Sequence, residues 1–181
     1  MLALTPHPGE PPVANSVTVQ WEWHEARRLW LRYHVEAALE QLELPGPSGR
    51  AKRKDGLWQT TCFELFLRTP GGHAYCEFNF SPSQDWAAYS FTDTRTGQAD
   101  LALPRPPEIF GEASDTHFAL EATLTIPDIL RGTALGGALS AVVAEKVGLT
   151  SYWALHHPDP AKPDFHHPGC FVADLSPPSG S

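Results

Sequence analysis

The side chains with the most chemical potential gather near the end of the chain, in the stretch SYWALHHPDPAKPDFHHPGCF (151–171). Imidazole and carboxylate groups can bind a metal, hold a ligand, or hydrogen-bond a loop together. Adjacent histidines point to opposite sides of an extended chain, so they rarely chelate together. A metal site of His156, Asp164 and His166 is geometrically conceivable, but no fixed-spacing signature such as HExxH supports it. We therefore predict no metal and no cofactor, and leave open a structural role and a ligand-contact role for these three residues.

Two acidic residues interrupt otherwise apolar segments, Glu64 in CFELFL and Glu77 in YCEFNF. The short connection RTPGGH predicts that the two segments pair as strands, with both carboxyl groups on one face. Asn79 shares the face of Glu77 because side chains alternate along a strand. Paired acids occur in glycoside hydrolases and in sugar-binding sites, whereas a buried Glu can also be satisfied structurally. Of the two functional roles, binding is favoured over catalysis, and the structural role stays open.

Three of the six tryptophans, Trp58, Trp86 and Trp153, lie near strand ends or loops beside polar residues. Flat rings in such places can stack on sugars or other planar ligands, although each ring could equally belong to the core. No GxSxG elbow, P-loop or GxGxxG motif occurs, and no cysteine has a recognisable catalytic context. The sequence therefore predicts a protein that is not an enzyme.

The composition of the chain excludes some classes of binding partner and indicates a cellular location. The formal net charge is −8 and no basic stripe occurs, which argues against nucleic acid and anionic membranes as partners. The three cysteines are widely spaced, with no CxxC pair, so a disulfide framework is not expected. The first residues do not follow a signal-peptide pattern, and no apolar run is long enough to span a membrane. We expect a cytoplasmic protein with a small polar ligand, and a protein partner remains open.

The elements that must position these residues are mostly strands. Eighteen prolines and fourteen glycines divide the chain into short pieces. A period of two residues over 17–23, 29–35, 73–81 and 117–127, with apolar side chains on one face, predicts half-buried strands. Many short strands separated by turns are typical of an all-β, two-sheet antiparallel β-sandwich. One stretch, 24–44, is rich in helix formers, and its part from 36 to 44 is left unassigned.

Both ends of the chain are rich in Pro, Gly and Ser and have little to bury. The predicted organisation is a flexible N-terminal tail over 1–16, one β-sandwich domain over 17–175, and a flexible C-terminal tail over 176–181.

Three segments together resemble a known family: DGLWQTTCFELFL (55–67), YCEFNFSPSQDWAAYSF (75–91) and the histidine-rich stretch 151–171. They are similar to bacterial DOMON-like proteins related to family 9 carbohydrate-binding modules, and most similar to a group whose members sometimes accompany a MurB-type reductase. The resemblance runs from about Val17 to Leu175. It implies a jelly-roll-like sandwich of two antiparallel sheets, with 29–35 as a strand.

Relatives in this superfamily bind sugars or haem in a cleft of the sandwich. Met1 is the only methionine, which disfavours a Met/His haem site and leaves bis-His ligation open. The positions that match the shared motifs are our candidate ligand-binding residues: Trp58, Glu64, Glu77, Asn79, Trp86, Trp153, His156, Asp164 and His166. The leading hypothesis is a non-catalytic module that binds a carbohydrate or another small polar ligand. The alternatives are a metal- or carboxylate-dependent hydrolase and a protein-interaction module without a small ligand.

Overall fold

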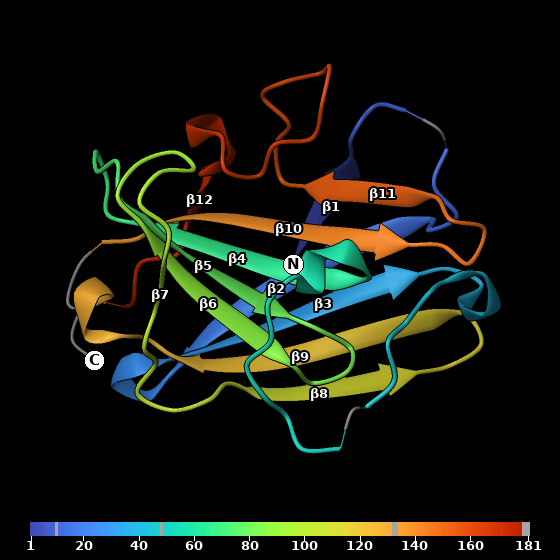
Figure 1. Ribbon diagram of the computed structural model, residues 1–181, viewed down its shortest axis with the longest axis horizontal. Coiled ribbons are helices and arrows are strands. Elements are labelled where there is room, and N and C mark those ends of the chain that lie inside the picture. The colour runs from blue at the N-terminus through green and yellow to red at the C-terminus, as the bar shows by residue number, and fades with distance from the viewer. Residues whose placement is uncertain (10, 48, 132–133, 179–181) are drawn as a thin grey trace.

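In the computed structural model, which describes residues 1–9, 11–47, 49–131 and 134–178, the strands pair into one curled antiparallel sheet (Figure 1). The described strands are β1 (Leu2–Pro6), β2 (Ser16–His24), β3 (Arg28–Glu36), β4 (Cys62–Arg68), β5 (Tyr75–Phe80), β6 (Trp86–Phe91), β7 (Ala99–Asp100), β8 (Glu108–Ala113), β9 (His117–Thr125), β10 (Gly136–Ala144), β11 (Thr150–Ala154) and β12 (Ala173–Asp174). Their order in the sheet is β7-β6-β5-β4-β10-β11-β1-β2-β3-β9-β8, and β12 pairs with β10.

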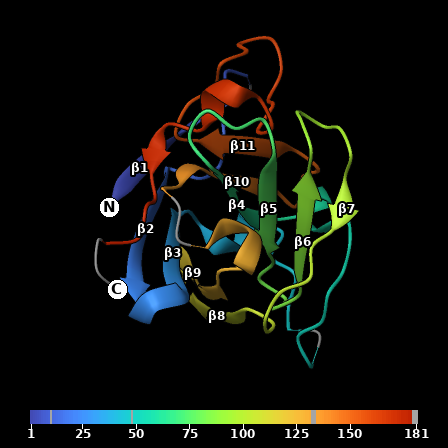
Figure 2. The same ribbon diagram turned by 90° about the vertical axis from the view of Figure 1, so that its left-hand side faces the viewer.

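Strand β1 joins the two halves of this sheet. Leu2 to Leu4 pair with β2, and Thr5 and Pro6 pair with β11. The prediction of an all-β antiparallel fold is confirmed. A sandwich of two separate sheets and its jelly-roll topology are not confirmed, because the described strands form one continuous path that bends back on itself (Figure 2). The flexible N-terminal tail predicted over 1–16 is corrected in part, since Leu2–Pro6 form a strand that pairs first with β2 and then with β11.

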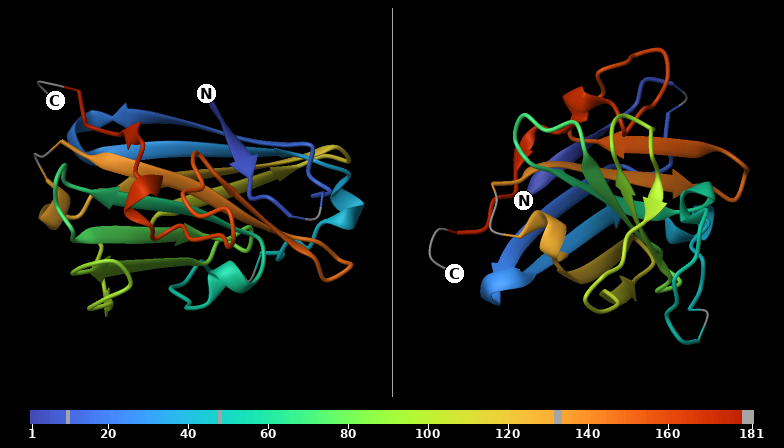
Figure 3. Two further views of the ribbon diagram at one scale, coloured as in Figure 1. Left: turned by 90° about the horizontal axis from the view of Figure 1, so that it is seen from above. Right: turned by 60° about the vertical axis from the view of Figure 1, so that its left-hand side comes forward.

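The main core fills the space between the two halves of the sheet, which run as two layers in Figure 3. The ring of Tyr33 on β3 lies 5.0 Å from that of Phe63 on β4, and Phe63 lies 6.1 Å from Phe118 on β9. Alternate residues of the predicted strands face this core, including the fully buried Leu31 and Leu120. The alternation read from the sequence therefore reports the packing correctly on these strands.

A second apolar cluster lies on the outer face of β4, β5, β6 and β10. Strand β5 is buried on both faces, although its alternation predicts one exposed face. The segment 155–172 between β11 and β12 causes this difference, because the rings of His166 and Phe171 contact those of Phe66 and Tyr75. The outer face of these strands is thus covered by this segment, and the polar residues on it are buried.

Helical structure is limited, in the described part of the chain, to short 3-10 turns. They are η1 (Glu25–Arg27), η2 (Leu39–Gln41), η3 (Leu57–Gln59), η4 (Asp128–Leu130) and η5 (Pro168–Cys170). The helix formers of 24–44 therefore yield a strand flanked by two turns, because the strand buries alternate apolar residues against the core. None of the described helices is long and apolar enough to cross a membrane.

Candidate functional site

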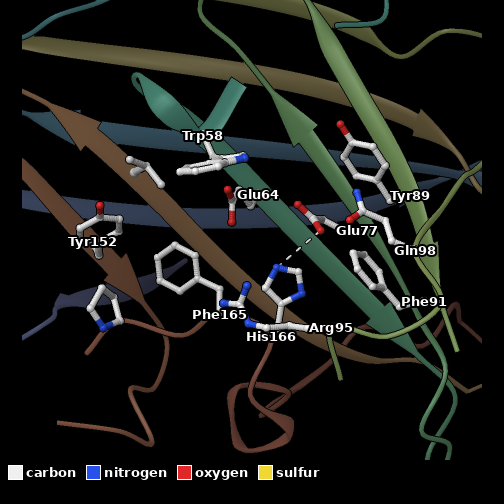
Figure 4. Close-up of a pocket in the computed structure, with 12 residues that line it drawn as sticks. Trp58, Glu64, Glu77, Tyr89, Phe91, Arg95, Gln98, Tyr152, Phe165 and His166 are labelled. Carbon is white, nitrogen blue, oxygen red and sulfur yellow. Dashed lines mark ion pairs between the residues drawn. The ribbon is translucent and has the colours of Figure 1, made fainter. Parts of the chain in front are cut away.

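A cavity of about 520 Å³ lies on the outer face of the β4-β5-β6-β10 half of the sheet, opposite the main core (Figure 4). Its floor comes from the strands, and its walls come from the turn η3, the loop between β6 and β7, and the segment 155–172. The lining residues are Trp58, Glu64, Glu77, Tyr89, Phe91, Arg95, Gln98, Val142, Tyr152, Pro163, Phe165 and His166.

Two carboxyl groups, those of Glu64 on β4 and Glu77 on β5, form the centre of the floor. They are only 4% and 6% exposed. The Ser140 hydroxyl donates to Glu64 Oε2 at 3.3 Å, and the Asn79 amide donates to Glu77 Oε1 at 2.9 Å. Strand pairing sets this arrangement, because Glu64 lies directly opposite both Ser140 and Asn79 in the register.

Burial raises the pKa of both carboxyl groups above the ordinary value. For Glu64 the negative charge of Glu77 raises the pKa further, and it outweighs the opposing effect of the Ser140 hydrogen bond. A low-dielectric site disfavours two neighbouring negative charges. The pair therefore holds protons to a higher pH than exposed carboxyl groups do.

His166 closes one side of the floor. Its Nδ1 lies 2.8 Å from the Tyr75 hydroxyl, and its Nε2 lies 3.7 Å from Glu77 Oε2 (Figure 4). The Tyr75 oxygen already accepts a hydrogen bond from the Arg95 backbone N–H at 3.1 Å. Its own hydrogen is then free to donate to Nδ1, and in that tautomer the imidazole hydrogen lies on Nε2, facing Glu77.

The imidazole of His166 is uncharged near neutral pH. Burial, with a smaller contribution from the Arg95 charge, lowers its pKa to about 4. The contact of 3.7 Å with Glu77 is therefore not an ion pair at neutral pH, since that would require a protonated ring. His166 instead supplies the cavity with a neutral hydrogen-bond donor.

An ion pair fastens the loop between β6 and β7 to the segment 155–172. Arg95 donates to Asp164 Oδ1 at 2.7 Å, and the backbone N–H of His166 donates to the same oxygen at 3.2 Å. Burial alone would raise the pKa of Asp164, but the Arg95 guanidinium and the His166 backbone hydrogen bond lower it overall. Asp164 thus positions both Arg95 and His166 without lining the cavity itself.

Aromatic rings form much of the wall. Trp58 is 54% exposed at the rim, on the opposite side of the carboxyl pair from Phe165 and His166 (Figure 4). The Tyr89 hydroxyl donates to Asp55 Oδ1 at 2.6 Å, so it is already engaged. An exposed ring above buried polar groups can stack on a flat apolar surface of a ligand.

The structure brings some of the candidate residues together and separates others. The candidates that line the cavity are Trp58, Glu64, Glu77 and His166. Asn79 supports Glu77 through a hydrogen bond. Asp164 supports Arg95 and His166 in the same way. Three lie elsewhere: Trp86 and Trp153 are buried in the main core and His156 is exposed outside the cavity. The ligand-binding roles themselves remain predictions.

Strand parity explains both the misplaced tryptophans and the residues that sequence reasoning missed. Trp86 faces the core, and Tyr89 and Phe91 face the cavity from the opposite side of β6. On β11, Trp153 faces the core and its neighbour Tyr152 faces the cavity. The period of two residues within WAAYSF and TSYWA already indicates that these neighbouring aromatic residues lie on opposite faces of the strands. Nothing in the sequence singled out the loop residues Arg95 and Gln98.

Within the described ranges, no group of three or more His, Cys, Asp or Glu residues is arranged to hold a metal ion. His166 and Asp164 do not converge with His156. The Nε2–H of His157 donates to the backbone oxygen of Thr5 at 2.9 Å, which ties the segment to β1. The histidines of this stretch therefore serve partly to attach it to the sheet.

Comparison with known proteins gave structural matches only: no family model and no curated protein matches the chain. The crystal structure of a candidate carbohydrate-binding protein from Bacteroides uniformis matches with a TM-score of 0.56 and 15% identity, over 93% of this chain and 83% of that chain. A family 9 carbohydrate-binding module from Caldicellulosiruptor kristjanssonii, in complex with glucose, matches with a TM-score of 0.45 and 13% identity, over 79% and 71% of the two chains. The first match shows a shared fold, and the second is too distant to establish one.

Proposed function

We propose that this protein is a non-catalytic module that binds a small, sugar-like ligand in the cavity beside Trp58. The observation that carries the proposal is a buried carboxyl pair, Glu64 and Glu77, at the floor of an open cavity with aromatic walls. Buried polar groups need partners. A ligand rich in hydroxyl groups would supply them, and the Trp58 ring would cover its apolar face.

The size and setting of the cavity support this function. About 520 Å³ falls within the range of roughly 300–1,000 Å³ that is usual for small-molecule sites. Gln98 and Arg95 add polar groups at the rim, and His166 adds a neutral donor near Glu77. The matching fold of a candidate carbohydrate-binding protein adds support of a general kind. Membership of the DOMON-like group, and the company of a MurB-type reductase, are further parts of the proposal.

A carboxylate-dependent hydrolase is the second candidate, and one observation favours it. Both carboxyl groups in the cavity have raised pKa values, and the pair is close enough for the charge of Glu77 to raise the pKa of Glu64. Glycosidases use two carboxyl groups, one of them protonated, on either side of the scissile bond. Release of sugar from an oligosaccharide by the wild-type protein, abolished in Glu77→Gln, would favour this candidate over the binding module.

Thermal unfolding against a panel of simple sugars, amino sugars and nucleotide sugars tests the proposal. A ligand at 100 times its Kd stabilises a protein by about 2.7 kcal/mol, which raises the midpoint of a domain of this size by roughly 5–11 °C. We expect such a rise with one class of sugar, absent in Glu77→Gln and kept in Glu22→Gln, whose side chain is 70% exposed on the other half of the sheet. A flat panel would overturn the proposal and favour the protein-interaction module.

A further inference from the structure

The floor of the cavity has more hydrogen-bond acceptors than donors. Glu64 and Glu77 present carboxyl oxygens, and only the Ser140 hydroxyl and the Asn79 amide donate to them. Asn79 does not line the cavity, but next to Glu77 its Oδ1 is a further acceptor that is buried without a hydrogen-bond partner. A ligand that fills this cavity must therefore bring donors, or the carboxyl groups must keep protons.

Positive charge is equally scarce around the pair. Among the residues that the structure describes, no Lys or Arg lies within ion-pair distance of Glu64 or Glu77. Arg95 is the cavity-lining residue with a permanent positive charge, and Asp164 already neutralises it at 2.7 Å.

The other groups that face the carboxyl pair do not compensate for its charge. His166 is neutral near pH 7 because burial lowers its pKa to about 4. Burial holds the thiol of Cys62 protonated by raising its pKa, and the hydroxyl of Tyr89 is committed to Asp55. The hydroxyl of Tyr75 is likewise already hydrogen-bonded, to Nδ1 of His166. The counter-charge that the protein supplies is that of Arg95, which lowers the pKa of both carboxyl groups by less than burial raises it.

We infer that the cavity selects a cationic sugar, one that carries a primary ammonium group, which sits over Glu64 and Glu77 while Trp58 covers the ring. This inference rests on the proposed sugar-binding function and names the class of ligand. An ammonium group supplies three donors and no acceptor, which matches the floor better than a hydroxyl group, since a hydroxyl brings acceptors as well. Charge-assisted hydrogen bonds are also about twice as strong as neutral ones.

Isothermal titration calorimetry at about pH 6.5 with four probes tests this inference, since an ordinary amine is largely protonated there. The probes are glucosamine, N-acetylglucosamine, glucose and putrescine. We expect glucosamine to bind at least tenfold more tightly than the two neutral sugars. Glu64→Gln and Glu77→Gln should each remove that preference, and Glu22→Gln should keep it. Circular dichroism and thermal unfolding establish that each variant is folded.

Wild-type protein alone provides a second readout. An ammonium group beside a carboxyl pair with raised pKa values favours the ionised form, so binding should release protons. The measured heat should then differ between buffers of different ionisation enthalpy for glucosamine, and not for glucose.

The outcomes separate the inference from the function on which it rests. Equal or tighter binding of the neutral sugars would overturn the inference and leave sugar binding intact. Putrescine binding as tightly as glucosamine would support recognition of an ammonium group and contradict recognition of a sugar. A failure of all four probes to bind would contradict both.

Discussion

The buried imidazole of His166 makes stability depend on pH in a way that can be measured. Its pKa is about 4 in the folded protein, against an ordinary value of 6.5. The folded state therefore resists protonation, so the stability that this group contributes is complete above pH 6.5 and is lost as the pH falls toward 4. A difference of about 2.5 pH units at 1.36 kcal/mol each gives a loss of about 3 kcal/mol.

The assay compares thermal unfolding of wild-type protein and His166→Gln between about pH 7.5 and pH 4. Glu64 and Glu77 act in the opposite direction, because their raised pKa values favour the protonated folded state as the pH falls. The difference between the two proteins isolates His166. We expect the wild-type midpoint to fall relative to the variant by roughly 6–12 °C across this range.

The variant also loses ring contacts with Phe66 and Phe91, whose centroids each lie 5.2 Å from that of His166. This loss lowers the unfolding midpoint of the variant by the same amount at every pH. The readout is therefore how the difference between the two midpoints changes with pH. His73→Gln, at a side chain 83% exposed, is the matched control and should follow the wild type. Parallel curves for wild type and His166→Gln would refute the description of His166 as a buried, neutral group.

Three further predictions follow from the cavity. Glu64→Gln should raise the unfolding midpoint at pH 8, because it removes a carboxyl group whose pKa is raised by burial, and the gain should vanish near pH 4 in a pH series of melts. Trp58→Ala should change the free energy of unfolding by less than about 0.5 kcal/mol, since the ring is 54% exposed, yet weaken sugar binding several-fold in calorimetry through the loss of about 1 kcal/mol of stacking. Asp164→Asn should lower the free energy of unfolding by about 1 kcal/mol, a modest amount because its partner Arg95 is 58% exposed, and denaturant titrations should show the gap shrinking in high salt.

The sequence predicted the strands well wherever one face meets the core and the other meets solvent. Leu29 to Val35 and Phe118 to Ile126 alternate as the structure shows, because the pleat of a strand imposes a period of two residues. The same rule failed at β5, where Glu77 and Asn79 are buried rather than exposed. The cover over them comes from a segment some ninety positions later, and no local pattern reports such a contact.

The site was predictable to a similar extent. Glu64 and Glu77 stood out as acids within apolar strands, and the short connection between those strands correctly predicted that they pair. Arg95 could not be found in this way, since its place depends on the ion pair with Asp164 across a long interval of sequence. Trp153 is a candidate ligand residue in the sequence because it matches a shared motif and lies near a strand end beside polar residues, whereas the register of β11 turns it toward the core.

The tryptophan side chains allow the most direct test of ligand binding in this cavity. Their indole N–H groups give separate signals in a ¹H–¹⁵N NMR spectrum, and a Trp58→Phe variant identifies the signal of Trp58. Titration with glucosamine, and separately with glucose, should move the Trp58 signal most and leave the core residues Trp86 and Trp153 nearly unchanged. A Trp58 signal that stays fixed with both sugars, or moves less than those two core signals, would contradict the central claim that this cavity binds a sugar-like ligand.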